Sequence, residues 1–165
     1  MAGRFADKKR TYAQSQTRSD PKSRTASTAA TSHALEPRGP WRWGQPVVVL
    51  QGPRTIGAAE SFVQMLATIP TVTTMGAPTA GANGKPQPLD LGSSVGFELI
   101  VQVPTSNVLD ASGKSYADVG LAPKVAFTPK PTSFTSDSDD LLTAALERLR
   151  KQAKGVRRAG KPGKQ

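Results

Sequence analysis

The chain has 165 residues, contains no cysteine and carries a formal net charge of +10. This length allows a single domain, and the absence of cysteine excludes both a disulfide framework and a thiolate metal site. The charge is uneven: residues 1–44 carry +6, residues 45–146 carry −3 and residues 147–165 carry +7. We therefore expect a mildly acidic folded part and no nucleic-acid partner, because the basic residues lie outside it.

The first 44 residues are expected to form a disordered, basic tail. They are rich in Ser, Thr, Arg, Ala and Pro and show no apolar periodicity, so they bury too little surface to offset the entropy of ordering. The tail holds the only histidine, His33, and we therefore expect neither a Ser-His-Asp triad nor a histidine metal site. No signal peptide is recognised, and no apolar run approaches the ~18 residues of a membrane span. This predicts a soluble protein without indicating a compartment.

Residues 45–69 predict a buried strand, a tight loop and an amphipathic helix. Residues 47–50 form a continuous apolar run, which is typical of a strand covered on both faces. Gly52 and Pro53 break this run, and from Ala58 onward apolar residues recur at helical spacing. Many hydrolytic enzymes present a nucleophile at such a turn, where the helix N-terminus offers free N–H groups to an oxyanion.

The rest of the chain predicts further strands and one more helix. The β-branched segment 71–75 predicts a strand, and a glycine-rich loop occupies residues 76–84. Residues 97–103 predict a strand, residues 110–114 a turn, and residues 125–127 a short last strand. Acidic residues at 137–140 begin an amphipathic helix that we expect to end near residue 150. The order predicts an α/β domain over residues 45–150, followed by a basic disordered tail at 151–165.

Several segments resemble the tail-specific, or C-terminal processing, serine peptidases and their interphotoreceptor-retinoid-binding and tricorn-core relatives. Residues 55–60 are similar to the family's T-x-S-A-x-E segment, and the loop at 76–84 to its G-x-x-T-x-G-x-x-G sequence. Residues 120–125 and 139–149 match two later family segments, in the expected order. The chain departs from the family pattern at Lys124, where an aspartate is expected. The resemblance implies an α/β fold of the Clp protease/crotonase-like type, a layered β-α spiral.

The resemblance also implies which positions correspond to the catalytic residues. Gly57 stands at the position of the family nucleophile, and Ala82 at the position of the lysine base. Lys85, three residues further on, is a weaker candidate for the base. Ser61 is a weak candidate for a substitute nucleophile, since it lies one helical turn away around the axis. Asp118 lies near the place where some relatives carry a catalytic acid.

The same resemblance assigns Ala58, Thr79, Gly81 and Gly84 to the oxyanion site or substrate loop, and it implies neither a metal nor a cofactor. The family's earlier D-x-R-x-N-x-G-G segment does not occur before Pro46. The chain is therefore expected to be the second half of a peptidase domain. A partner would then supply the missing half-domain.

The expected function is that of a serine-type peptidase family member that hydrolyses peptide bonds. We expect this member to be truncated and catalytically impaired, because Gly57 has no side chain to act as a nucleophile. The alternative is a non-catalytic module that binds a peptide or an apolar ligand and carries basic tails. In both cases the expected ligand is a polypeptide.

Overall fold

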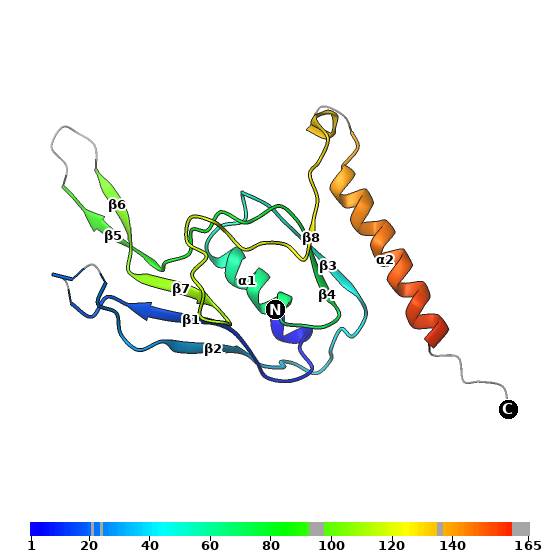
Figure 1. Ribbon diagram of the computed structural model, residues 1–165, viewed down its shortest axis with the longest axis horizontal. Helices are drawn as coiled ribbons and strands as arrows, with labels where there is room; N and C mark the ends of the chain where they lie inside the picture. Colours follow the sequence, from blue (N-terminus) through cyan, green and yellow to red (C-terminus); the bar gives the residue numbers. More distant parts are fainter. Residues whose placement is uncertain (21, 24, 93–97, 135–136, 160–165) are drawn as a thin grey trace.

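The computed structural model describes residues 1–20, 22–23, 25–92, 98–134 and 137–159. It shows the mixed α/β architecture that the order of predicted elements indicated (Figure 1). The elements, in chain order, are η1 (Ala2–Arg4), β1 (Arg10–Thr17), β2 (Thr31–Leu35), β3 (Val47–Gln51), α1 (Ala58–Ala67), β4 (Val72–Gly76), β5 (Pro86–Asp90), β6 (Ile100–Pro104), β7 (Ser106–Asp110), β8 (Val125–Ala126), η2 (Pro131–Phe134) and α2 (Asp140–Ala159).

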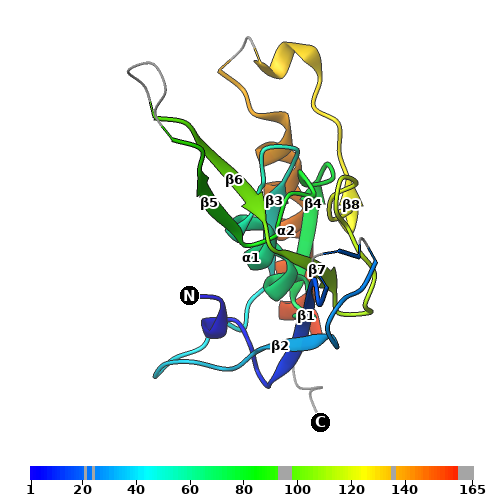
Figure 2. The same ribbon diagram turned by 90° about the vertical axis from the view of Figure 1, so that its left-hand side faces the viewer.

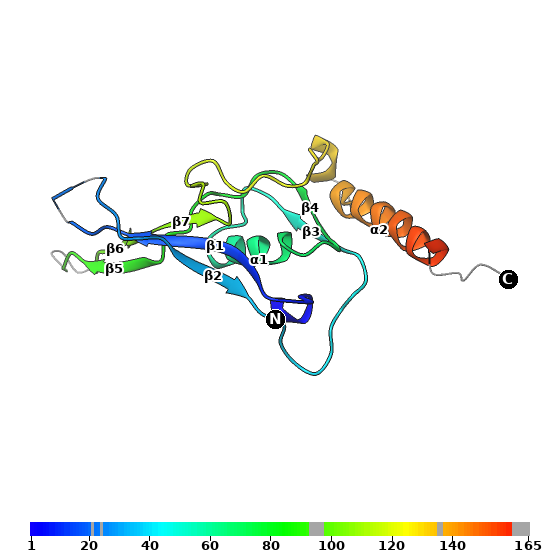
Figure 3. The same cartoon turned by 60° about the horizontal axis from the view of Figure 1, so that its bottom comes forward.

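A parallel sheet of order β3-β4-β8 supports the central part of the molecule. Strand β3 pairs with β4 along its whole length, from Val47 opposite Val72 to Gln51 opposite Gly76. All five residues of β4 are buried. Helices α1 and α2 lie on opposite sides of this sheet (Figures 1 and 3). The strands predicted at 47–50 and 71–75 are observed. The expected burial on both faces holds for β4 but not for β3, in which Val47, Val48 and Val49 are half-buried and Leu50 is exposed, because β3 is an edge strand of this sheet.

A second, antiparallel sheet has the order β2-β1-β7 and lies on the far side of α1 (Figure 3). Strand β1 pairs with β2 on one edge and with β7 on the other. Helix α1 therefore lies between the two sheets and contacts both β1 and the parallel strands. Its buried face includes Val63 and Leu66, in agreement with the predicted amphipathic pattern.

The N-terminal segment differs from the expected disordered tail of residues 1–44. It contributes η1, β1 and β2, and its small side chains Ala2, Ala6 and Ala13 are buried together with Leu35. The physical reason lies in pairing at long range. Strand β1 hydrogen-bonds to β7, which follows almost a hundred residues later, and thereby gains the burial that its own composition does not suggest.

Strands β5 and β6 form a separate two-stranded hairpin that projects from the body of the molecule (Figures 1 and 2). Every residue of both strands is exposed. Leu89 lies opposite Val101, and Gln87 opposite Val103, so apolar side chains gather on one face of the hairpin. The strand predicted at 97–103 is observed at 100–104, and its first residue lies outside the described residues.

Helix α2 continues to Ala159, beyond the predicted end near residue 150. It packs against β3, and its residue Ala145 is buried. The expected tail at 151–165 thus begins within this helix, and residues 160–165 lie outside the described residues. None of the described helices has the length and apolar character needed to cross a membrane.

Candidate active site at the start of helix α1

Gly57 is the residue that precedes the first turn of α1, as the sequence predicted for the nucleophile position. Its backbone angles are φ 61° and ψ −118°, a conformation that side-chain-bearing residues rarely adopt. Space is nevertheless available for a side chain, since the nearest atom to an added Cβ is the carbonyl oxygen of Ala82 at 4.0 Å. The position therefore combines a turn conformation that favours glycine with an open side.

The buried carboxylate of Glu60 connects the start of α1 to the glycine-rich loop. Its Oε1 accepts hydrogen bonds from Thr79 Oγ1 at 2.6 Å and from the Gly81 amide at 2.7 Å. Its Oε2 accepts from the amides of Gly57 and Ala82, both at 3.1 Å. The side chain is 0% exposed, so these four bonds compensate for the loss of its hydration. In the sequence, Glu60 is the last residue of the segment 55–60 that resembles the family's T-x-S-A-x-E, and no contact with the loop was predicted from it.

Thr79, Gly81 and Asp118 support the loop and do not line a cavity at the site. Besides binding Glu60, Thr79 Oγ1 accepts a hydrogen bond from the Leu121 amide at 2.8 Å. Gly81 has φ +70°, and a Cβ there would lie 2.8 Å from three backbone atoms of residues 116, 118 and 120. Asp118 is exposed and donates its amide hydrogen to the Gly81 carbonyl at 3.1 Å. These residues therefore set the backbone path of the loop.

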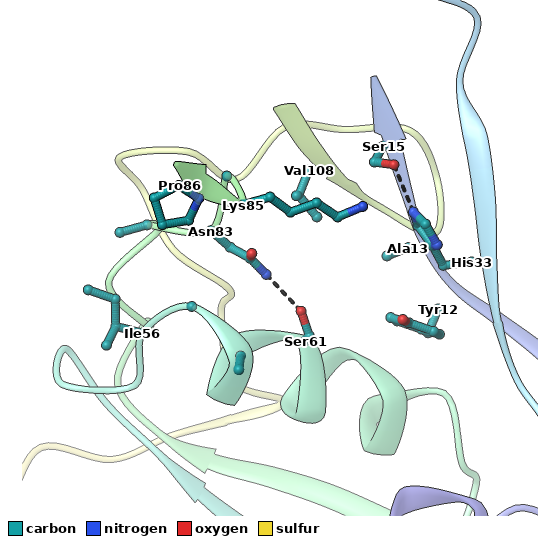
Figure 4. Close-up of a pocket in the computed structure, with 14 residues that line it drawn as sticks. Tyr12, Ala13, Ser15, His33, Ile56, Ser61, Asn83, Lys85, Pro86 and Val108 are labelled. Carbon is teal, nitrogen blue, oxygen red and sulfur yellow. Dashed lines mark hydrogen bonds between the residues drawn. The ribbon is translucent and has the colours of Figure 1, made fainter. Parts of the chain in front are cut away.

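A pocket of about 710 Å³ opens beside the start of α1 (Figure 4). One wall comes from α1 and the loop, and it contains six of the residues predicted from the sequence. The opposite wall comes from β1, β2 and β7 and was not predicted. The lining residues are Tyr12, Ala13, Ser15, His33, Ile56, Gly57, Ala58, Ser61, Ala82, Asn83, Gly84, Lys85, Pro86 and Val108.

The predicted wall presents amides, hydroxyls and one lysine to the pocket. Ser61 Oγ accepts a hydrogen bond from Asn83 Nδ2 at 2.8 Å and so is held within this wall. Lys85 is exposed and has φ +47°, and its side chain extends toward the opposite wall (Figure 4). Ala82 offers only a methyl group where the resemblance places the base. No carboxylate is among the residues that line the pocket.

The unpredicted wall contains a hydroxyl–imidazole pair. Ser15 Oγ and His33 Nε2 are 2.7 Å apart, and both side chains are half-buried. The ring of Tyr12 lies next to His33, with ring centroids 6.2 Å apart. Sequence reasoning missed these residues because it assigned them to a disordered tail. The residues of β1 give no local signal for a strand, since its apolar residues Tyr12 and Ala13 are adjacent and do not alternate with polar ones.

The side chain of Lys124 holds the far end of α1 in place. Lys124, which stands where the family pattern has aspartate, donates from Nζ to the carbonyl oxygens of Ala67 and Val72, both at 3.0 Å. It therefore holds the C-terminal end of α1 against the start of β4.

Tyr116 is buried behind the loop, and burial raises the pKa of its phenol to about 12.

At the start of α1, a strand-to-helix turn with a positive φ at Gly57 thus opens into a pocket. The sequence profile of peptidase family S41 matches residues 1–127, and the chain belongs to this family. No curated protein sequence matches the chain. The described residues contain no cluster of histidine and carboxylate side chains that could hold a metal ion.

Solved structures share this fold. A candidate peptidase from Parabacteroides merdae is 25% identical, with a TM-score of 0.76 over 90% of this chain. The photosystem II D1 C-terminal processing protease is 18% identical, with a TM-score of 0.53 over 81% of this chain. Mature CPAF in complex with lactacystin is 19% identical, with a TM-score of 0.57 over 74% of this chain. The matches cover 45%, 32% and 22% of those three chains, respectively.

Proposed function

We propose that the pocket beside α1 binds polypeptide and corresponds to the serine-type peptidase site of family S41, with its covalent step impaired. The observation that carries this proposal is the geometry of Gly57. This residue begins α1 at a positive φ and opens into the pocket, but it has no hydroxyl group. Without a nucleophile at this position, an acyl-enzyme cannot form there.

A second feature adds to the impairment. Ala82 lines the pocket at the position that the family resemblance gives to the lysine base, and its methyl group cannot accept a proton. General-base catalysis contributes roughly 10²–10⁴-fold to such reactions. Lys85 stands in the same wall, but its side chain is exposed to solvent and, within the described residues, is not hydrogen-bonded to residue 57. A hydroxyl restored at residue 57 alone would therefore lack an activated proton acceptor.

The solved relatives are more than twice as long as the region that matches this chain. We propose that the described elements form the second half of a Clp protease/crotonase-like layered spiral. A further segment or a partner chain would then add the strand that completes the substrate site. Under this proposal, the half described here binds the polypeptide. The missing half supplies further N–H groups that stabilise the oxyanion.

The test is to measure binding and cleavage of a fluorescein-labelled unstructured polypeptide such as casein. We expect an increase in anisotropy on binding, and we expect no cleavage that depends on residue 57, either in the natural chain or in Gly57→Ser. Ala82→Trp fills the pocket and should weaken binding at least tenfold. Ala122→Trp is the matched control, since Ala122 is exposed outside the pocket and its replacement should leave binding unchanged.

Three results would contradict the proposal. If the natural chain fails to bind the polypeptide, or if both tryptophan variants weaken binding equally, the pocket is not the binding site. If the natural chain cleaves the polypeptide and Ser61→Ala abolishes that cleavage, Ser61 is the nucleophile and the site is not impaired in the way proposed here.

A further inference from the structure

The wall of the pocket opposite Gly57 contains a second hydroxyl group that is already paired with a base. Ser15 lies on β1 and His33 on β2, and Ser15 Oγ and His33 Nε2 are 2.7 Å apart. In the strand register His33 lies opposite Ala13, so Ser15 is its diagonal neighbour on the paired strand. Both residues line the pocket, and both are accessible enough to react with a molecule bound in it.

We propose that Ser15 and His33 form a nucleophile–base pair that accepts acyl groups from activated esters bound in this pocket. The distance of 2.7 Å lies within the 2.6–3.2 Å range that proton transfer to a general base requires. The pair acts independently of residue 57 and does not depend on polypeptide binding. His33 serves as the base in the tautomer that carries its proton on Nδ1, because Nε2 must then accept the hydroxyl proton.

The reaction balances without any further reagent besides water. Ser15 Oγ forms a bond to the ester carbonyl carbon while its proton moves to His33 Nε2. The bond from this carbon to the leaving oxygen then breaks, and Nε2 returns the proton to the departing alkoxide. Water subsequently attacks the acyl-serine and gives a proton to Nε2. Ser15 Oγ leaves, takes up that proton, and the free acid is released.

The surroundings of His33 restrict the substrate class to activated esters. Within the described residues, Ser15 is the only hydrogen-bond partner of the imidazole, so no carboxylate orients the ring from Nδ1. Loss of the productive carboxylate contact lowers the rate of a serine protease triad by roughly 10⁴-fold. An ester with a good leaving group tolerates such a loss, whereas an amide also needs protonation of its leaving amine. Tyr12, Ala13 and Val108 line the adjoining wall and favour a small apolar acyl group.

The experiment treats the full chain with an alkyl fluorophosphonate, which bonds to activated serines, and locates the adduct by peptide mass mapping. In this reaction Ser15 Oγ displaces fluoride from phosphorus, and His33 takes the proton. We expect a single adduct on Ser15, its loss in Ser15→Ala, and labelling at least tenfold slower in His33→Gln. Glutamine can still hydrogen-bond to Ser15 but cannot act as the base. Ser32→Ala is the matched control, because Ser32 is an exposed serine of the same strand, β2. In this variant Ser15 should be labelled at the natural rate.

The absence of an adduct, an adduct on Ser61, or unchanged labelling of His33→Gln would overturn the proposal. A second variant covers the case in which His33→Gln does not fold. In Ser15→Cys, His33 should make the thiol react with iodoacetamide at least tenfold faster than the thiol of Ser32→Cys at neutral pH. Equal rates for the two thiols would also overturn the proposal.

Discussion

Replacement of Glu60 by glutamine tests how the loop is held against α1. The natural carboxylate accepts four hydrogen bonds, two on each oxygen, and is fully buried. A glutamine has almost the same shape, but one of its oxygens becomes an NH2 group, which can only donate. If the NH2 group faces Gly57 and Ala82, both of their amides lose an acceptor. If it faces the other side, the Gly81 amide loses its acceptor, whereas the Thr79 hydroxyl can turn and accept from the NH2 group.

The magnitude follows from the number of bonds lost. A hydrogen bond to a charged group contributes about 1.5–3 kcal/mol, so the loss of one or two should lower the free energy of unfolding by about 1.5–6 kcal/mol. Since small domains have total stabilities of about 5–15 kcal/mol, this single atom exchange would remove much of the stability of the fold. The loop at residues 76–84 should be the first part to open, because three of the four donors lie in it.

Equilibrium unfolding in urea, followed by circular dichroism, measures the change for Glu60→Gln. Glu147→Gln, at an exposed position of α2, is the matched control and should alter stability by less than about 0.5 kcal/mol. Amide hydrogens of the loop should also exchange faster in Glu60→Gln than in the natural chain, because the loop is released from α1. A stability loss below about 1 kcal/mol would refute this account of the loop.

Two further predictions concern the backbone of the loop and the residue buried behind it. Gly81→Ala should destabilise the fold by more than about 2 kcal/mol, because the new methyl group meets backbone atoms at 2.8 Å, whereas Gly52→Ala has open space and should be nearly neutral in the same urea assay. The raised pKa of Tyr116 means that, between pH 10 and about 12, the folded state keeps a phenol proton that the unfolded state loses. Stability should therefore be unaffected by Tyr116 below pH 10 and should fall by on the order of 2 kcal/mol as pH rises toward 12. Tyr116→Phe should remove this alkaline component, and an unchanged pH profile in that variant would contradict the assignment.

The part of the site that could be predicted from the sequence is the part determined by local patterns. The apolar run of β3, the break at Gly52 and the helical spacing after Ala58 are close together in the chain, and each one indicates its own conformation. Gly57 therefore appeared at the start of α1 as expected. The resemblance to a known family added the glycine-rich loop, whose own residues do not indicate where it folds back.

The opposite wall of the pocket could not be predicted in this way. Strand β1 contains few β-branched or large apolar residues, and its place in the sheet depends on pairing with β7 almost a hundred residues later. The composition of a segment indicates only how much apolar surface its own side chains can bury. It therefore does not predict a strand that is buried because distant strands pair with it. His33 was excluded as a functional residue for this reason alone, although it lines the pocket.

The two walls of the pocket differ in how firmly they are held, because hydrogen bonds fix α1 at both of its ends. Glu60 holds the first turn to the loop, and Lys124 holds the last turn to β4, so the helix cannot slide or tilt without breaking bonds at one end. Strands β1 and β2 are held by main-chain pairing and by small buried residues such as Ala13, and the side-chain contact between them, Ser15–His33, is half-buried. A ligand that widens the pocket will therefore displace these strands and leave α1 in place. Amide hydrogen exchange should show this directly, with slow exchange in α1 and faster exchange in β2.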